Sequence, residues 1–549
     1  MSATILKSFT FLLCSILISS FSIDKTKNFI LDNEGRCSIF HGVNVIVKLP
    51  PYLPDLEKFD PLTSLNTEYD LKVMKKLGFN MIRLGVIWEA VERQPGVYDM
   101  DYLEKVEEII NKLGENGIYT MVDAHQDAFA RNFCGEGVPY FYTNLLGYDK
   151  KCNANMVTQF LGFIGACKTL DDFDFSYDEN GLPEINDCKK RSFIEYHFLA
   201  EFSSAYKKFY ENTANIQEKF VEFWKVVAKR FKGNKYILGY DLWNEPTPGG
   251  FLEDIKTVVP GKADIEIVLP LYRKVDKALR EIDPDYILFF ENTPIPDTLP
   301  VFGGLTWGTM TEKPGTDDQN QVYNFHSYCC VSGANACENG EASLKNSLTL
   351  CPKFHNNKFA KEIDNAKNNL HIPMFVSEFG ACSDSQACYN EIMNVVSICE
   401  KNFISWSYWN YKPYGDHTTT AIELVEYEGV YNPDGTIQTI KEKGLSRAYV
   451  QYYQGLPIDF NYEDRSSTNF ETSFEYHADI EAPTVLYYNK EFFYSNGYKI
   501  EVINDITKEN LLENNAAIID EKTDNYLDIK INSNLVKDKT KIRIVFKSL

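Results

Sequence analysis

The chain has 549 residues, a formal net charge of −22 at neutral pH, 44% hydrophobic residues and 14% aromatic residues. This length exceeds one ordinary hydrophobic core, so we expect one large domain and a smaller one. The acidic balance argues against nucleic acid and anionic membrane surfaces as partners, because both require clusters of Lys and Arg. It is compatible with neutral or zwitterionic partners. Composition favours core packing as the role of the aromatic residues.

The first 22 residues are predicted to be a signal peptide. Lys7 supplies a positive charge, residues 9–18 form an apolar run, and Ser19, Ser20 and Ser22 offer small residues for cleavage. That run is too short to span a bilayer, and no later stretch has the roughly 18–20 apolar residues of a membrane helix. We therefore expect a secreted protein, or one delivered to an endolysosomal-type lumen.

The cysteines agree with export. Of 13 cysteines, Cys14 lies in the predicted leader, which leaves an even number. The close sets 329, 330, 337 and 351, and 382 and 388, are typical of disulfides in loops rather than of a metal site, because none has the paired spacing of a zinc site. The pairing itself cannot be deduced from the sequence.

Residues 28–455 alternate short apolar runs with longer amphipathic stretches. The strand-like runs are Ile39–Val47, Asn80–Val86, Tyr119–Ala124, Ile237–Leu242, Ile287–Phe290, Val322–Phe325, Met374–Val376 and Phe403–Tyr408. The helix-like stretches include Glu68–Leu77, Tyr102–Glu115, Phe202–Phe231, Ile265–Ile282, Phe359–Asn368 and Glu391–Asn402. Eight strands alternating with helices predict an α/β fold, the (β/α)8 or TIM barrel.

Two segments depart from the barrel pattern. Residues 129–192 carry four cysteines and turn residues, which predicts an insertion stapled at the rim of the barrel. Residues 473–549 show short apolar runs bounded by Asn, Asp, Gly and Lys, and we expect a small C-terminal β-sandwich domain there. The linker is predicted at residues 457–472.

Polar or aromatic residues follow every predicted strand, where a barrel places its functional groups. Strands buried on both faces otherwise carry only apolar residues, so this pattern indicates a site. The candidate residues, in chain order, are Asn44, Lys48, Arg83, His125, Asp127, Asn244, Glu245, His326, Tyr328, Glu378 and Trp409.

Two of these residues, Glu245 and Glu378, can form the carboxyl pair that cleaves a glycosidic bond. Such cleavage needs one protonated carboxyl group beside the leaving oxygen and one ionised carboxylate that attacks the anomeric carbon. Arg83 and Tyr328 can hold Glu378 ionised, whereas Glu245 has no obvious cation of its own. Trp409 offers a flat surface for a sugar ring.

Each residue alone has an ordinary structural interpretation. A single Glu after a strand is more often a helix cap or an ion-pair partner, and a single His or Arg is more often structural. Their joint occurrence on successive strands reverses those odds. Glu291 and Asp123 stay open between the two interpretations, with a structural role favoured for Asp123.

The ordered set Arg83, His125, Asn244-Glu245-Pro246, His326, Tyr328, Glu378-Phe379-Gly380 and Trp409 resembles glycoside hydrolase family 5. Within it, residues 42–54 (GVNVIVKLPPYLP), His125-Gln126-Asp127 and residues 134–139 (CGEGVP) resemble the endoglycoceramidase group. The resemblance implies Glu245 as acid/base, Glu378 as nucleophile and retention of anomeric configuration. It also implies that Lys48 and Asp127 hold the sugar next to ceramide, with Asn44 nearby.

We therefore expect a retaining hydrolase of the sugar–ceramide bond of glycosphingolipids, with transient contact with a lipid surface or micelles and no metal or cofactor. Tyr140, Phe141, Phe251 and Trp307 are candidate walls of a ceramide cleft. Three alternatives stay open: a glucosylceramidase or β-glucosidase on the same barrel, a polysaccharide endoglucanase, and a secreted pseudoenzyme that binds glycans or lipids. Pure binding would not need both glutamates with Arg83 and Tyr328.

Overall fold

The computed structural model describes residues 20–152, 167–250, 254, 257, 259, 261–294, 310–332, 337–338, 341–418 and 422–549. Eight parallel strands form a closed barrel, and each overlaps one of the eight predicted runs, so the (β/α)8 prediction is confirmed. The barrel strands are β4 (His41–Val45), β5 (Met81–Gly85), β8 (Tyr119–Asp123), β9 (Ile237–Asp241), β10 (Leu288–Glu291), β11 (Gln321–Ser327), β14 (Met374–Phe379) and β15 (Ser405–Tyr408).

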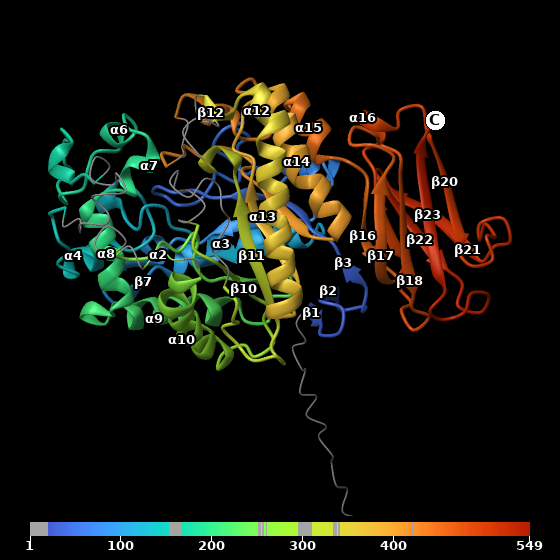
Figure 1. The fold of residues 1–549 in the computed structure, drawn as a ribbon, viewed down its shortest axis with the longest axis horizontal. Helices are drawn as coiled ribbons and strands as arrows, with labels where there is room; N and C mark the ends of the chain where they lie inside the picture. Colours follow the sequence, from blue (N-terminus) through green and yellow to red (C-terminus); the bar gives the residue numbers. More distant parts are fainter. Residues whose placement is uncertain are drawn as a thin grey trace, which may run out of the picture.

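Amphipathic helices surround the barrel (Figure 1). In α3, for example, Leu103, Val106 and Ile110 are buried at helical spacing, and Asp99 caps the first turn by accepting a hydrogen bond from the backbone N–H of Tyr102. The main barrel helices are α1 (Tyr69–Lys76), α3 (Met100–Gly114), α9 (Ile216–Phe231), α10 (Leu269–Arg280), α13 (Cys351–Asn365), α14 (Gln386–Asn402) and α15 (Thr439–Leu445).

The helix predicted over residues 202–231 is interrupted. The chain forms α8 (Ala200–Tyr210), a 3-10 turn η4 (Thr213–Asn215) and then α9. Asn212, Ala214 and Asn215 adopt positive φ angles of 57°, 55° and 57°, and asparagine tolerates this left-handed conformation better than most residues. The apolar periodicity continues from α8 into α9, so the sequence pattern did not reveal the break between the two helices.

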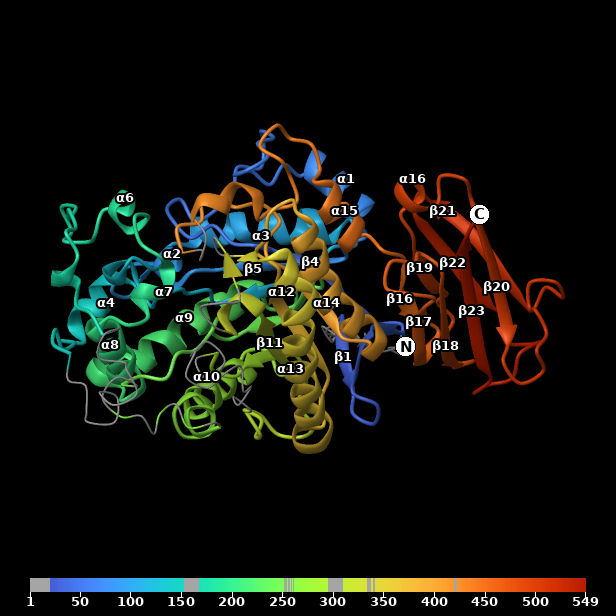
Figure 2. The same ribbon diagram turned by 45° about the horizontal axis from the view of Figure 1, so that its top comes forward.

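Two further sheets lie beside the barrel, as both Figure 1 and Figure 2 show. They face each other across a common core that includes Phe474, Tyr487 and Ile544. The predicted linker at 457–472 is instead part of a hairpin of the second sheet. The C-terminal strands are β16 (Tyr449–Tyr453), β19 (Thr484–Tyr487), β21 (Ala517–Thr523) and β22 (Tyr526–Ile531) in one sheet, and β17 (Gly455–Tyr462), β18 (Phe470–Tyr476), β20 (Tyr498–Asn504) and β23 (Lys541–Ser548) in the other.

The first of these sheets also contains N-terminal strands that the sequence did not predict. They are β1 (Phe21–Asp24), β2 (Phe29–Asp32) and β3 (Cys37–Ser38), and β3 pairs with β16. Phe21 is buried against the rings of Phe40 and Tyr119, at centroid distances of 5.4 and 4.7 Å. The hairpin thus covers the end of the barrel where the strands begin. Residues 1–19 of the predicted leader lie outside the described residues.

Disulfides staple the loops at the other end of the barrel. The insertion is closed by Cys134–Cys188 and Cys152–Cys167, and two later loops by Cys329–Cys351 and Cys382–Cys388. The described part of the insertion holds η1 (Arg131–Phe133), α4 (Tyr140–Leu145), η3 (Leu170–Asp172) and α6 (Ile185–Cys188). Among the described cysteines, Cys37 and Cys399 are free thiols, and both are buried. No helix within the described ranges has both the length and the apolar character needed to cross a bilayer.

Candidate active site

Arg83, on β5, lies at the centre of the polar cluster at the carboxyl ends of the strands. Its guanidinium is fully buried and contacts Glu378 Oε1 at 2.6 Å, Asp241 Oδ2 at 2.9 Å and Asp123 Oδ1 at 3.0 Å. It also donates a 2.8 Å hydrogen bond to Asn244 Oδ1. A planar guanidinium can serve several acceptors at fixed angles, so Arg83 holds β8, β9 and β14 in register at their functional ends.

Glu378 is the last residue but one of β14 and is held from two sides. Arg83 contacts one carboxylate oxygen, and the Tyr328 hydroxyl donates a 2.9 Å hydrogen bond to the other. Burial raises the pKa of Glu378, while the positive charge of the neighbouring Arg83 acts in the opposite direction. Both oxygens therefore point to fixed donors, a geometry that supports the ionised carboxylate.

Glu245, after β9, has a different environment. One carboxylate oxygen lies 2.7 Å from His326 Nδ1, and the backbone N–H donates a 2.8 Å hydrogen bond to Glu291 Oε1. Burial raises the pKa of Glu245, and the negative charge of Asp127 raises it further. Among the described residues, no Lys or Arg forms an ion pair with this carboxyl group, which supports its protonated form.

The two glutamates face each other across a narrow gap. A carboxylate oxygen of Glu245, one of Glu378 and a ring nitrogen of His326 all lie within 4.8 Å of one another. His326 Nδ1 is 3.5 Å from Glu378 and 2.7 Å from Glu245, so the ring spans the pair. Burial lowers the pKa of His326 to about 3, so this histidine is neutral and adds no charge between the carboxyl groups.

A second cluster lies next to this pair, around the indole of Trp409. The ring of His125 stacks on the indole at a centroid distance of 5.6 Å, and Lys48 Nζ lies 4.6 Å from its centre. Lys48 forms a 2.6 Å ion pair with Asp127. Burial lowers the pKa of His125, but the contacts with Asp123 and Asp127 raise it by more, to about 10.

Asp416 and Thr418 complete this second cluster, and sequence reasoning missed both. Lys48 Nζ lies 2.9 Å from Asp416 Oδ1 and donates a 2.6 Å hydrogen bond to Thr418 Oγ1. The Thr418 hydroxyl lies 2.9 Å from Asp127 Oδ2. With Asp127, these contacts use all three protons of the Lys48 ammonium group. A signal existed, since Asp416 follows the eighth strand closely, but the sequence showed nothing that linked it to Lys48.

The remaining predicted site residues are also at this end of the barrel. Asn44 accepts a hydrogen bond from Arg83 and donates one of 2.9 Å to the backbone carbonyl of Ser377. Asn244 exchanges hydrogen bonds with Gln126 in both directions. These two asparagines therefore fix Arg83 and the turn that carries Glu245.

The residues left open by the sequence belong to the same network. Asp123 contacts Arg83 and accepts from His125 Nδ1 at 2.8 Å, and Glu291 orients the backbone of Glu245. Of the four predicted cleft walls, Tyr140 and Phe141 are half-buried on α4. Phe251 and Trp307 lie outside the described residues.

Two groups in the described chain bring His and carboxylate atoms close enough to hold a metal ion, namely Glu245-His326-Glu378 and His125-Asp127-Glu136. In the second, Lys48 already places a cation 2.6 Å from Asp127. A third group contains Cys329 and Cys351, whose sulfurs are bonded to each other. The chemistry supported by the carboxyl pair needs no metal.

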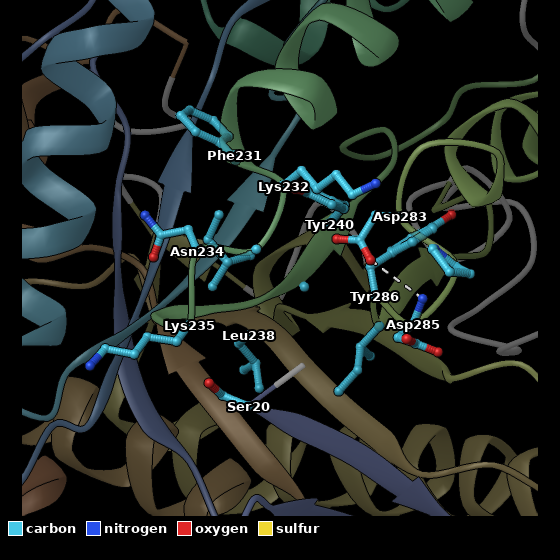
Figure 3. Close-up of a pocket in the computed structure, with 15 residues that line it drawn as sticks. Ser20, Phe231, Lys232, Asn234, Lys235, Leu238, Tyr240, Asp283, Asp285 and Tyr286 are labelled. Atoms are coloured by element: carbon cyan, nitrogen blue, oxygen red, sulfur yellow. Dashed lines mark hydrogen bonds between the residues drawn. The ribbon is translucent and has the colours of Figure 1, made fainter. Parts of the chain in front are cut away.

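The opposite end of the barrel carries a pocket of about 280 Å³ between the starts of β9 and β10. Figure 3 shows Asn234, Leu238, Asp283 and Tyr286 around it, together with Ser20 at the start of the N-terminal hairpin. Functional groups of (β/α)8 enzymes gather at the carboxyl ends of the strands. The catalytic site is therefore expected at the Arg83 cluster and not in this pocket.

Comparison with known families decides the class of the chain. The model described as "Cellulase (glycosyl hydrolase family 5)" matches residues 53–160 and 176–415. The chain belongs to glycoside hydrolase family 5. It is therefore a glycoside hydrolase, and the gap in the match at residues 161–175 falls inside the disulfide-closed insertion.

Several known proteins are similar to this chain over most of their length. An endoglycoceramidase of Cyanea nozakii is 29% identical over 503 residues, covering 89% of this chain and 87% of that protein. An endoglycoceramidase of Hydra vulgaris is 28% identical over 490 residues, covering 88% and 83%. Endo-glycoceramidase II from Rhodococcus sp., solved as a ganglioside GM3 complex, superposes with a TM-score of 0.69 at 20% identity, covering 95% of this chain and all of that one.

Proposed function

We propose that this family 5 hydrolase cleaves the β-glycosidic bond between an oligosaccharide and ceramide in glycosphingolipids, with retention of anomeric configuration. The observation that carries the mechanism is the short gap between Glu245 and Glu378, whose nearest oxygens lie within 4.8 Å. Retaining enzymes hold the two carboxyl groups about 5–5.5 Å apart, whereas inverting ones leave roughly 6.5–9.5 Å for a water molecule.

In the proposed first step, Glu378 attacks the anomeric carbon of the sugar joined to ceramide, and the bond to the ceramide oxygen breaks. Glu245 gives its proton to that oxygen, so ceramide leaves as a neutral alcohol. In the second step the ionised Glu245 takes a proton from water, and the water oxygen displaces Glu378 from the anomeric carbon. The product is a free oligosaccharide, and both carboxyl groups return to their starting states.

The assignment of roles rests on the difference between the two environments. Arg83 at 2.6 Å and Tyr328 at 2.9 Å stabilise the negative charge of Glu378 before it attacks in the first step and after water displaces it in the second. Glu245 contacts a neutral histidine instead, which lets it gain and lose a proton within the cycle.

The substrate class is supported by the relatives, two of which are named endoglycoceramidases and match nearly the whole chain. Trp409 and Asp127, the latter positioned by Lys48, would hold a sugar ring beside the glutamates, since an indole face and a charged hydrogen-bond acceptor suit a hexose. The four disulfides among the described residues support passage through an oxidising compartment, and we propose export on this basis together with the leader-like residues 1–22.

The test is hydrolysis of ganglioside GM3 and of lactosylceramide by the purified protein, with products identified by mass spectrometry. Intact oligosaccharide plus ceramide supports the proposal. Single glucose from glucosylceramide alone would make it a glucosylceramidase, and hydrolysis of soluble cellulose alone an endoglucanase. Absence of any turnover would leave the pseudoenzyme alternative. Proton NMR of the first product formed should show the β-anomer, and the α-anomer would contradict retention.

A further inference from the structure

Helix α12 (Leu344–Thr349) has its apolar residues on its exposed face, whereas a helix that packs on a protein core buries them. Ser347 is fully buried, whereas Leu344 is 53% exposed and Leu348 is 57% exposed. Leu350, directly after the helix, is 42% exposed. Residues four apart lie on the same face of a helix, so Leu344 and Leu348 form one outward apolar surface.

Hydrogen bonds hold the helix in this orientation. The side chain of Asn390 donates a 3.0 Å bond to the Ser347 hydroxyl, and the side chain of Asn394 donates a 3.0 Å bond to the Ser347 carbonyl. Both asparagines lie on α14. The inner face of α12 is thus fixed by polar contacts, and rotation of the helix to bury the leucines would break them. These hydrogen bonds therefore keep the two leucines on the exposed face of the helix.

This surface lies at the rim of the candidate active site. The Cys329–Cys351 disulfide, with a Cα–Cα distance of 5.3 Å, ties the end of the α12 segment to the residue after Tyr328. Tyr328 itself donates to Glu378. Figure 1 places α12 at the top of the barrel, the end toward which the arrow of β11 points.

We propose that Leu344, Leu348 and Leu350 insert into a neutral or zwitterionic lipid surface that presents the substrate next to the catalytic glutamates. The proposal rests on the function proposed above, because a ceramide-linked sugar is held in such a surface until it is cleaved. The net charge of −22 disfavours an anionic surface, whereas leucines need only an apolar layer to enter. An exposed apolar patch beside an active site fits a lipid better than water.

The direct test is co-sedimentation with phosphatidylcholine vesicles that contain no glycolipid. The wild-type protein should bind, and Leu344→Ser/Leu348→Ser should bind at least about tenfold more weakly, because each buried methylene contributes to partition into lipid. The matched control is Leu535→Ser, since Leu535 is 61% exposed but lies in the turn between β22 and β23, in the C-terminal part of the chain. Equal binding of the double variant and wild type would overturn the proposal.

A second measurement compares substrates in two physical forms. On lactosylceramide in phosphatidylcholine vesicles, the double variant should lose at least about tenfold in rate, and on a soluble aryl lactoside it should match wild type. An equal loss of rate on both substrates would mean that the leucines support the structure of the active site and not contact with lipid, and it would overturn the proposal. So would a light-scattering result in which the leucines hold two copies of the chain together. If the protein cleaves no glycolipid but the double variant still loses vesicle binding, the proposed function fails and the lipid surface stands.

Discussion

The ammonium group of Lys48 lies 2.9 Å from the carboxylate of Asp416, so the loop after the first barrel strand is joined to the loop after the eighth. Asp127 and Thr418 take the other two protons of the same group. In this state Lys48 has no proton left to donate to a sugar hydroxyl. We infer that Lys48 positions Asp127, whose carboxylate accepts from a sugar hydroxyl, while the buried Asp416 anchors the ammonium group.

Changes at Lys48 and Asp416 should therefore be coupled. Lys48→Met and Asp416→Asn should each lower kcat/KM on lactosylceramide by roughly ten- to a hundredfold, the range expected when one charge-assisted hydrogen bond is lost. The double variant should be no worse than the poorer single variant, because both changes disrupt one unit. A double-mutant cycle measures this, and Lys72→Met at the exposed Lys72–Glu68 pair is the control. Simple multiplication of the two losses would contradict the positioning role.

The two glutamates should respond differently to substitution. Glu378→Gln and Glu245→Gln should both abolish turnover of glycolipid while circular dichroism and Tm show an intact fold. Glu245→Ala should still form the glycosyl-enzyme on substrates with good leaving groups, and azide should restore its turnover. Mass spectrometry of the trapped enzyme would detect the intermediate. Failure of both trapping and azide rescue would refute the acid/base role of Glu245.

The pH profile of kcat/KM should be bell-shaped. The acid limb reports ionisation of Glu378 and the alkaline limb loss of the proton of Glu245. Burial raises the pKa of both groups, so both limbs should lie at higher pH than the titration of a free glutamate. On an aryl lactoside with a good leaving group, Glu245→Gln should remove the alkaline limb alone. An optimum above about pH 8 would contradict these roles.

Arg83 should control the acid limb. Lysine cannot contact three carboxylates in the fixed directions of a guanidinium, so Arg83→Lys should weaken the contact with Glu378 and raise the pKa of that carboxyl further. The acid limb should then move to higher pH and kcat should fall by at least tenfold. Arg93→Lys, at an exposed pair with Asp99, is the matched control. An unchanged acid limb would separate Arg83 from the ionisation of Glu378.

The mature N-terminus should retain Phe21. This ring is buried against Phe40 and Tyr119, so cleavage after residue 20 keeps strand β1 whole, whereas cleavage after residue 22 removes Phe21 and the first half of the strand. Loss of a buried aromatic ring costs about 3–5 kcal/mol. N-terminal sequencing of the exported protein locates the cleavage site, and a chain starting at Ile23 should show a lower Tm than one starting at Phe21.

Much of the barrel could be predicted because its strands and helices repeat with two different periods. All eight strand runs were visible, and the residues after them pointed to one end of the fold. The division between α8 and α9 could not be predicted, because it depends on the φ angles of Asn212 and Asn215 within an unbroken apolar pattern. The hairpin from Phe21 was hidden because it lies next to the apolar run of the predicted leader.

The site divides in the same way. Glu245 and Glu378 could be predicted to lie at the same end of the barrel because each comes at the carboxyl end of an apolar, strand-like run. Asp416 and Thr418 lie in an irregular loop, and only the fold brings them to Lys48. The outward orientation of the α12 leucines could not be predicted either, since it depends on where Asn390 and Asn394 of another helix lie.

The pairing of β3 with β16 joins residues near the start of the chain to residues that follow the whole barrel. Such pairing gives the protein a high contact order, since hundreds of residues must be synthesised before Cys37 can meet Tyr453. The barrel can begin to form during translation, but the seven-stranded sheet cannot assemble until the chain is nearly complete. A version truncated after residue 455 would keep both glutamates and still expose the edge of β16, a site for aggregation.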